Sequence, residues 1–323
     1  MDAQDTVRDK TAGVSASRPS YEDATPECDL AEEIRFAVVM YGGVSLAIYI
    51  NGIAQELLNL VYASAPSEAM ASQAQAPLKP NKELKGAQPV YRVIAQCLAR
   101  WREGDRDVRT ILSEAIKHND IRHAAVALAD KPIRTRFVVD ILSGTSAGGI
   151  NAIFLAKALA NGQSIDGLKK LWVQEGDLAL LINDDVSVKE LAGWKVTVPQ
   201  TSLLNSRRMY QKLLEAFDDL EISRPSQKDV DSSLVGELDL FVTTTDINGL
   251  PLPVKLADKI IYEKRHRNVL HFRYSGSAGT DSCSNDFLQR NDAFLAFAAR
   301  CTSSFPFAFD PMRLADIDEV TRG

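Results

Sequence analysis

The 323-residue chain has four cysteines, and no two of them lie at a spacing typical of a metal site or a redox pair. Cys28, Cys97, Cys283 and Cys301 are scattered along the chain without a Cys-x-x-Cys pair. This pattern predicts reduced thiols in a cytosolic protein and excludes a zinc site or a disulfide framework. The N-terminal stretch before Cys28 is polar and acid-rich, and it lacks the apolar segment of a signal peptide.

Long hydrophobic runs and strong net charge are also lacking. The longest apolar stretch, Val44–Tyr62, is interrupted by Asn51, Gln55 and Glu56, so it favours a buried helix and predicts no transmembrane segment. The formal net charge is -6, which argues against nucleic acid as a partner. With 45% hydrophobic and 25% charged residues, the composition is that of an ordinary globular protein.

The stretch Arg136–Ala160 (RFVVDILSGTSAGGINAIFLAKALA) carries the strongest functional motif. An apolar, β-branched run predicts a buried strand, and helical spacing of apolar residues resumes after the glycines. A strand, a G-x-S-x-G turn and a helix together indicate a nucleophile elbow, with Ser146 as the nucleophile and Gly144 and Gly148 as the small residues around it. The amide groups at the start of the helix, among them that of Ala147, favour an oxyanion. A plain glycine-rich turn is the alternative.

A second strand, glycine turn and helix precede the elbow. Ile34–Met40 predicts a central strand, and Leu46–Tyr62 predicts a helix. Between them, Gly42 and Gly43 lack side chains that would block a substrate. Next to a nucleophile elbow, such a loop is a candidate for the second half of an oxyanion hole.

The rest of the chain alternates predicted helices and strands. Residues 1–30 are predicted to be disordered, with order beginning near Glu33, and about 63–89 is predicted to be a flexible insertion within a domain that spans 31–323. Further elements are predicted as helices at Tyr91–Arg102, Val108–Lys117, His123–Ala129, Gly167–Glu175, Ser206–Phe217 and Asp292–Arg300, and as strands at Leu238–Thr245, Pro251–Leu256 and Asn268–Tyr274. The last two strands suggest a short antiparallel excursion. The alternation predicts an α/β sandwich around a mainly parallel sheet.

A serine nucleophile needs a base, and the chain has only four histidines. In the order Ser, Asp or Glu, His, only His266 and His271 could complete a triad, after Asp239 or Asp246. Nothing in the local sequence singles either of them out. A carboxylate that takes the proton directly, as in a Ser–Asp dyad, is the other solution.

Four stretches are informative when taken together: Met40–Gly52 (MYGGVSLAIYING), Gly144–Gly149 (GTSAGG), Phe241–Val254 (FVTTTDINGLPLPV) and Ala299–Pro311 (ARCTSSFPFAFDP). In order and spacing they resemble the patatin-like phospholipase family, whose members are serine acyl hydrolases with a Ser–Asp dyad. The resemblance implies a three-layer α/β/α sandwich around a mainly parallel sheet. It also implies Ser146 as the catalytic residue and amides near Gly42, Gly43 and Ala147 as the oxyanion hole.

Two departures from the family pattern stand out. The family's glycine loop reads G-G-G-x-R-G, whereas this chain has Tyr41 to Leu46 there and lacks the arginine. The family's catalytic aspartate lies in an Asp-Gly-Gly or Asp-Gly-Ala motif, and no Asp-Gly pair follows Pro306. Asp310, Asp316 and Asp318 lack the required glycines. The resemblance therefore implies a domain whose C-terminal part is missing, with no catalytic aspartate in this chain.

The resemblance implies a hydrolase of lipid esters, most simply of phospholipids, in the cytoplasm or peripherally at a membrane. It implies no cofactor and no metal, a lipid substrate with a transient membrane surface as partner, and no nucleic acid. The main alternative is an inactive lipid-binding or interaction module, or a nonfunctional fragment. A phosphate-binding fold on the two glycine turns and a soluble acyltransferase are further alternatives.

Overall fold

A computed structural model of the chain describes residues 21–22, 24–67, 78–176, 178–189, 195–196, 199–222, 232–276 and 284–317. The strands are β1 (Cys28–Met40), β2 (Ile133–Gly144), β3 (Glu237–Lys255), β4 (Ile260–Ser275) and β5 (Ser284–Asn285). The helices are α1 (Ala47–Ser64), α2 (Gln88–Glu103), α3 (Arg106–His118), α4 (Ile121–Leu128), α5 (Ala147–Asn161), α6 (Leu168–Lys170), α7 (Leu178–Leu181), α8 (Ser206–Ile222) and α9 (Asp292–Ser303). A π-helical turn, Leu171–Glu175, continues α6.

The strands form one mixed sheet in the order β1-β2-β3-β4-β5. β1 pairs with β2 and β2 with β3 in parallel, whereas β4 and β5 are added antiparallel. Met40 lies opposite Gly144, and Gly144 lies opposite Val242, so the carboxyl ends of β1 and β2 meet beside the middle of β3. A sheet that is parallel at its start, combined with helices, confirms the predicted α/β class.

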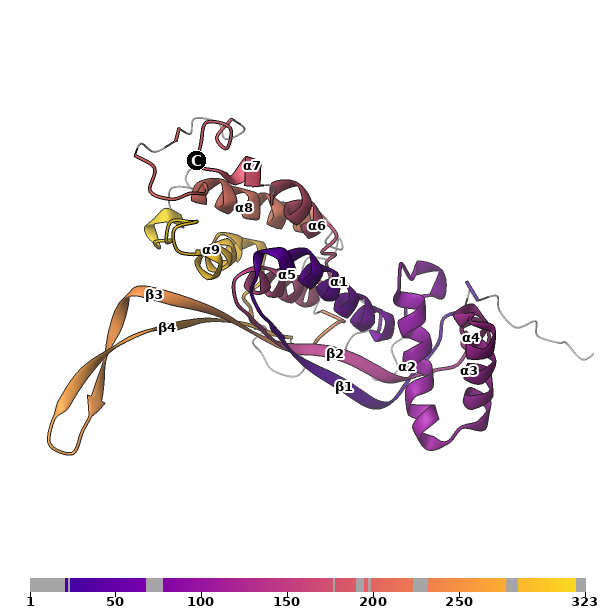
Figure 1. The fold of residues 1–323 in the computed structure, drawn as a ribbon. Helices are drawn as coiled ribbons and strands as arrows, with labels where there is room; N and C mark the ends of the chain where they lie inside the picture. The colour runs from indigo at the N-terminus through magenta and orange to yellow at the C-terminus, as the bar shows by residue number, and fades with distance from the viewer. Residues whose placement is uncertain are drawn as a thin grey trace, which may run out of the picture.

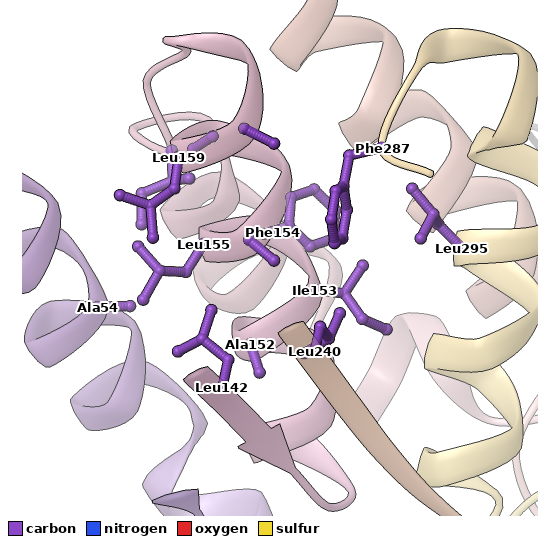
Figure 2. Close-up of a cluster of buried hydrophobic side chains, with 14 of the residues drawn as sticks. Ala54, Leu142, Ala152, Ile153, Phe154, Leu155, Leu159, Leu240, Phe287 and Leu295 are labelled. Carbon is purple, nitrogen blue, oxygen red and sulfur yellow. The ribbon is translucent and has the colours of Figure 1, made fainter. Parts of the chain in front are cut away.

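Helix α5 lies at the centre of the core. Every residue from Ala147 to Ala160 is buried, because the sequence is apolar around the whole helix and so presents no polar face to water. Figure 2 shows Leu155 directed toward Ala54 of α1, and Ile153 and Phe154 between Leu240, Phe287 and Leu295. The rings of Phe154 and Phe217 of α8 stack with their centroids 4.3 Å apart. The helix that follows the elbow is therefore fixed on several sides.

One charged side chain lies on this buried helix. The Lys157 ammonium, fully buried, contacts carboxylate oxygens of Glu221 of α8 at 2.8 Å and Asp292 of α9 at 2.7 Å. Burial raises the pKa of Asp292 to about 6, although Lys157 opposes the shift. This cluster ties α5 to the two helices beside it.

Helices α2, α3 and α4 form a smaller unit around the start of β2 (Figure 1). They match the predicted helices within a few residues. The predicted start of order near Glu33 is wrong, because β1 begins at Cys28. Residues 1–20 of the predicted tail and 68–77 of the predicted insertion lie outside the described residues.

The strands predicted at Leu238–Thr245 and Pro251–Leu256 are a single strand. β3 runs from Glu237 to Lys255 with an irregularity between Thr245 and Leu250, and it pairs with β4 as a hairpin that extends away from the helices (Figure 1). The predicted short excursion is therefore a long arm.

The predicted three-layer sandwich is seen only in part. Helices α1, α5 and α9 lie on one face of the sheet (Figure 1). On the other face, Val39 and Ile141 are 59% and 45% exposed. A second helix layer is not found within the described ranges, so this part of the sheet is covered on one side.

Helix α1 is apolar but only partly buried, which corrects the prediction of a buried helix. Within the described residues, Val44–Ser64 is the one helical stretch long and apolar enough to cross a membrane, with 28% of its apolar window buried. Ala54 and Leu58 pack against the core, whereas Ile48 and Tyr49 are exposed. The exposed face lies next to the glycine loop that precedes the helix.

Candidate active site

Ser146 lies in a sharp turn between the end of β2 at Gly144 and the start of α5 at Ala147. Its backbone has φ 57° and ψ −130°, a positive φ that a residue with a side chain rarely adopts. Such strain costs about 1–3 kcal/mol and persists only where the surroundings enforce it. The sequence Gly144-Thr145-Ser146-Ala147-Gly148 therefore forms the strained strand-to-helix turn that the motif predicts.

Three glycines make this turn possible because other chain segments come too close for a side chain. A Cβ on Gly144 would lie 2.6 Å from the Gly149 Cα. A Cβ on Gly148 would lie 2.2 Å from the Met40 carbonyl oxygen, so β1 passes directly against the first turn of α5. A Cβ on Gly42 would lie 2.5 Å from the Ser146 Cβ and 3.2 Å from its hydroxyl. The glycine loop and the serine are thus in direct contact.

The remaining two candidate oxyanion residues flank this contact. Gly43 has φ 143° and lies against Leu46. Ala147 is buried at the first position of α5, whose first amide groups have no partner within the helix. The Thr145 amide donates to the Met40 carbonyl at 3.1 Å, which holds the elbow against the end of β1.

A threonine of α9 holds the serine from the other side. The Ser146 amide donates to the Thr302 hydroxyl oxygen at 2.8 Å, and that hydroxyl donates to the Thr243 carbonyl at 2.8 Å. The hydroxyls of Thr145 and Thr243 also lie 2.5 Å apart. Sequence reasoning did not identify Thr302 or Thr243 as site residues, although both lie in segments that it compared with the family.

No candidate base reaches the serine within the described part of the chain. The His271 Nε2 lies 2.6 Å from Asp239 Oδ1, and the ring stacks on Phe241. The His266 Nδ1 contacts the Asp246 carbonyl at 2.8 Å. Among the described residues, neither imidazole is hydrogen-bonded to the Ser146 hydroxyl.

The candidate aspartates have structural roles in this arrangement. Asp246 Oδ1 accepts from the Asn248 and Gly249 amides, which are the hydrogen bonds of an Asx turn. The Asp310 carboxylate accepts from the hydroxyls of Thr201 and Ser202. Asp316 accepts from the Arg313 amide, and Asp318 lies outside the described residues.

Cys301, next to Thr302 at the end of α9, is half-buried, and its thiol is unreactive. Burial raises the pKa of the Cys301 thiol to about 11, so the thiol stays protonated near neutral pH. Burial lowers the pKa of Arg300 to about 10, and its guanidinium donates to the Ser206 and Asp310 carbonyls at 3.3 Å. This arginine therefore holds the loop after α9 against α8.

Exposed apolar side chains surround the elbow. Tyr41 and Val44 flank the glycine loop, and Phe305 and Phe307 follow Thr302 on the loop after α9. The described residues contain no group of three or more His, Cys, Asp or Glu side chains that could hold a metal ion. The described cysteines Cys28, Cys97 and Cys301 are free thiols, and Cys283 lies outside the described residues.

Comparison with known proteins gives two findings. A family model described as patatin-like phospholipase matches residues 121–318, which include Ser146 and Thr302. The chain is also 27% identical over 317 residues to a protein of Mycobacterium tuberculosis (strain ATCC 25618 / H37Rv) named "Uncharacterized membrane protein Rv3479". That match covers 95% of this chain and 24% of the relative, so the chain spans about a quarter of the relative's length. No solved structure was found to match.

Proposed function

The chain belongs to the patatin-like phospholipase family, and from this premise we propose that it is a serine acyl hydrolase domain that acts on lipid esters, most simply phospholipids. The strained backbone of Ser146, with Gly42 packed directly against it, is the observation that carries the proposal. A fold keeps a non-glycine residue at φ 57° only where many contacts enforce it. Here those contacts leave the Ser146 side chain half-buried beside Gly42 and Gly43, which have no side chains to block a substrate.

In this proposal the Ser146 hydroxyl oxygen attacks the acyl carbonyl and forms an acyl-enzyme, and the alcohol of the lipid leaves. Water then attacks the acyl-enzyme and releases the fatty acid. The backbone amides near Gly42, Gly43 and Ala147 stabilise the oxyanion, with the positive end of α5 directed at the same point. Gly144 and Gly148 give the turn its shape. The serine proton goes to a carboxylate base.

The base in this proposal is an aspartate that is not among the 323 residues of this sequence. The family pattern has it in an Asp-Gly-Gly or Asp-Gly-Ala motif after the segment matched by Ala299–Pro311, and this sequence has no such motif there. The absence of a described carboxylate or imidazole next to the Ser146 hydroxyl supports that choice over His271 and Asp246. No metal or organic cofactor enters the reaction.

The proposed setting is a cytoplasmic domain that meets its substrate at a membrane surface. The exposed apolar residues around the elbow, such as Tyr41 and Phe307, support a lipid substrate. The one relative reported above is named as a membrane protein, which agrees with this setting.

The second candidate is an inactive lipid-binding module with the same exposed surface. It is favoured by one observation, namely that the Ser146 hydroxyl has no acid–base partner among the described residues. The two candidates differ in whether Ser146 is reactive.

A fluorophosphonate probe, together with hydrolysis of a phospholipid in vesicles, tests the proposal. We expect labelling of this chain at Ser146, and fatty-acid release by a protein that also carries the aspartate base, with both lost in Ser146→Ala. Ser113→Ala, which removes a hydroxyl on α3 whose hydrogen-bond partner is the Arg109 carbonyl, is the matched control. Fatty-acid release that persists in Ser146→Ala would refute the assignment, and absent labelling of the native chain would favour the inactive module.

A further inference from the structure

The long β3–β4 hairpin has an outer part that the proposed chemistry does not use. We define the arm as residues 246–268, the part of the hairpin that follows the last β2–β3 pair, Gly144 with Val242. Every residue of the arm is exposed except Gly249 and Leu252, which are half-buried. A long two-stranded ribbon with exposed apolar side chains is marginal in water unless it meets a partner.

The arm projects from the same edge of the sheet as the serine. β2 and β3 run parallel, β2 ends at the elbow, and β3 continues past that level into the arm. Thr243, three residues before the arm, contacts the Thr145 hydroxyl. Figure 1 shows the arm extending beyond this point, away from the helices. A surface bound by the arm therefore faces the end of the sheet where Ser146 lies.

One face of the arm carries an apolar stripe. Pairing aligns Leu250 with Arg265, Leu252 with Glu263 and Val254 with Ile261, so these side chains share a face. Leu256 continues the same alternation at the turn, where its amide donates to the Lys259 carbonyl. Leu250 is 59% exposed and Ile261 is 40% exposed. The stripe thus runs along the arm and lies open to the surroundings.

The arm is basic in an acidic chain. It contains five lysines and arginines against three acidic residues, whereas the whole chain has a net charge of -6. The basic residues are Lys255, Lys259, Lys264, Arg265 and Arg267. None of them enters an ion pair with another described residue. An anionic partner therefore complements the arm and is repelled by the remainder of the molecule.

We infer that the arm docks the domain on an anionic lipid bilayer. The apolar stripe lies in the interface, and the basic side chains bind lipid phosphates. Arg265, paired with Leu250, lies on the same face as the stripe, so its guanidinium can reach the phosphates beside the apolar contact. The inference rests on the proposed function, because a lipid-ester substrate explains why a lipid surface should face the serine. Tyr41 and Phe307 would then approach the same surface.

Co-sedimentation with vesicles tests the arm without the need for turnover. We expect the native chain to bind phosphatidylcholine vesicles that contain phosphatidylglycerol, and added salt to weaken binding. Ile261→Asp lowers partitioning by about tenfold, since an apolar contact becomes a buried charge. Arg265→Gln, on the face of the stripe, lowers it by about fivefold on vesicles with phosphatidylglycerol and little on phosphatidylcholine alone. Ile116→Asp, at an isoleucine of α3 that is 78% exposed, is the matched control and leaves binding unchanged.

Fluorophosphonate labelling of the same variants separates this inference from the proposed function. If the native chain is labelled at Ser146 but does not bind the vesicles, or if Ile261→Asp binds as the native chain does, the docking inference is wrong. If binding depends on the arm but Ser146 is not labelled, docking stands and the hydrolase proposal fails. An arm-dependent dimer without vesicle binding would assign the stripe to a second copy and overturn the inference.

Discussion

Replacing Thr302 with valine removes the hydroxyl that holds the nucleophile's backbone and keeps the side-chain shape. The Thr302 γ-methyl packs against the first turn of α5, where a Cβ on Gly149 would lie 2.6 Å from it. Valine retains a methyl at this position. The substitution therefore deletes the two 2.8 Å hydrogen bonds, to the Ser146 amide and the Thr243 carbonyl, with little change in packing.

The size of the effect follows from these two bonds. Leaving a buried donor or acceptor without its partner costs about 1–3 kcal/mol. Because Ser146 is half-buried, we expect the free energy of unfolding to fall by about 2 kcal/mol. Without the Thr302 hydroxyl, the Ser146 backbone can also relax from its strained φ of 57°, which moves the serine out of its reactive position. If this raises the barrier for reaction at the serine by about 1.4 kcal/mol, the rate falls tenfold.

The assay combines urea unfolding with the second-order rate of fluorophosphonate labelling at Ser146. Thr302→Ser keeps the hydroxyl and loses only the methyl, so we expect its labelling rate to stay within about twofold of the native rate, well short of the tenfold loss expected for valine. Thr302→Val is expected to be slower at every pH, since no titrating group is changed. If Thr302→Val labels and unfolds like the native chain, the threonine does not hold the elbow, and the reasoning from these contacts is refuted.

Three further predictions concern the packing around the elbow. Gly148→Ala puts a Cβ against the Met40 carbonyl and should lower the free energy of unfolding, measured with urea, by about 3 kcal/mol or more. The control is Gly52→Ala in α1, where a Cβ would have no atom within 4 Å; it should leave the free energy of unfolding unchanged or raise it by about 0.5–1 kcal/mol. Lys157→Met withdraws the ammonium from two buried carboxylates and should cost about 3–5 kcal/mol, with Lys212→Met, at a more exposed ion pair, as the milder comparison. The pKa of Asp292 is raised to about 6, so the folded state binds this proton more tightly than the unfolded chain does. Protonated Asp292 therefore stabilises the fold at pH 4, and this contribution to the free energy of unfolding is lost as the pH rises to 6. If the free energy of unfolding of Asp292→Asn falls by the same amount over this range, the reasoning is contradicted.

The elbow and its helix could be predicted because their information is local. The stretch Arg136–Ala160 contains the strand, the glycines and the apolar helix in sequence, and the structure has β2, the turn and α5 at these positions. A turn that admits only glycine at Gly144 and Gly148 leaves a clear pattern in the sequence. The pairing of the glycine loop with the elbow was expected from the family resemblance, and Gly42 does contact Ser146.

The arm could not be predicted because prolines and a glycine mark strand ends in most sheets. Gly249, Pro251 and Pro253 therefore indicated a break and a short excursion. In the arm, β3 has a single partner strand, so a proline nitrogen can face solvent without removing a ladder hydrogen bond. Gly249 has φ 71° and forms the irregularity against the His266 ring.

The hydrogen bond between Thr302 and Ser146 could not be predicted from the local sequence, for a different reason. The two residues are 156 positions apart, and their contact depends on how α9 packs on α5. The exposed face of α1 was missed because a helix with apolar residues on all sides gives no sign of which side is buried. Ile48 and Ala54 are both apolar, yet only Ala54 is packed in the core.

The most direct test of the account is the reactivity of Ser146 itself. The native chain is treated with a fluorophosphonate probe, digested, and the labelled peptide is identified by mass spectrometry, with Ser146→Ala and the urea-unfolded chain measured in parallel. The account predicts one labelled serine, Ser146, whose labelling is lost in Ser146→Ala and on unfolding. Labelling that is absent from the native chain, or that remains in Ser146→Ala, would contradict the claim that this elbow carries a nucleophile.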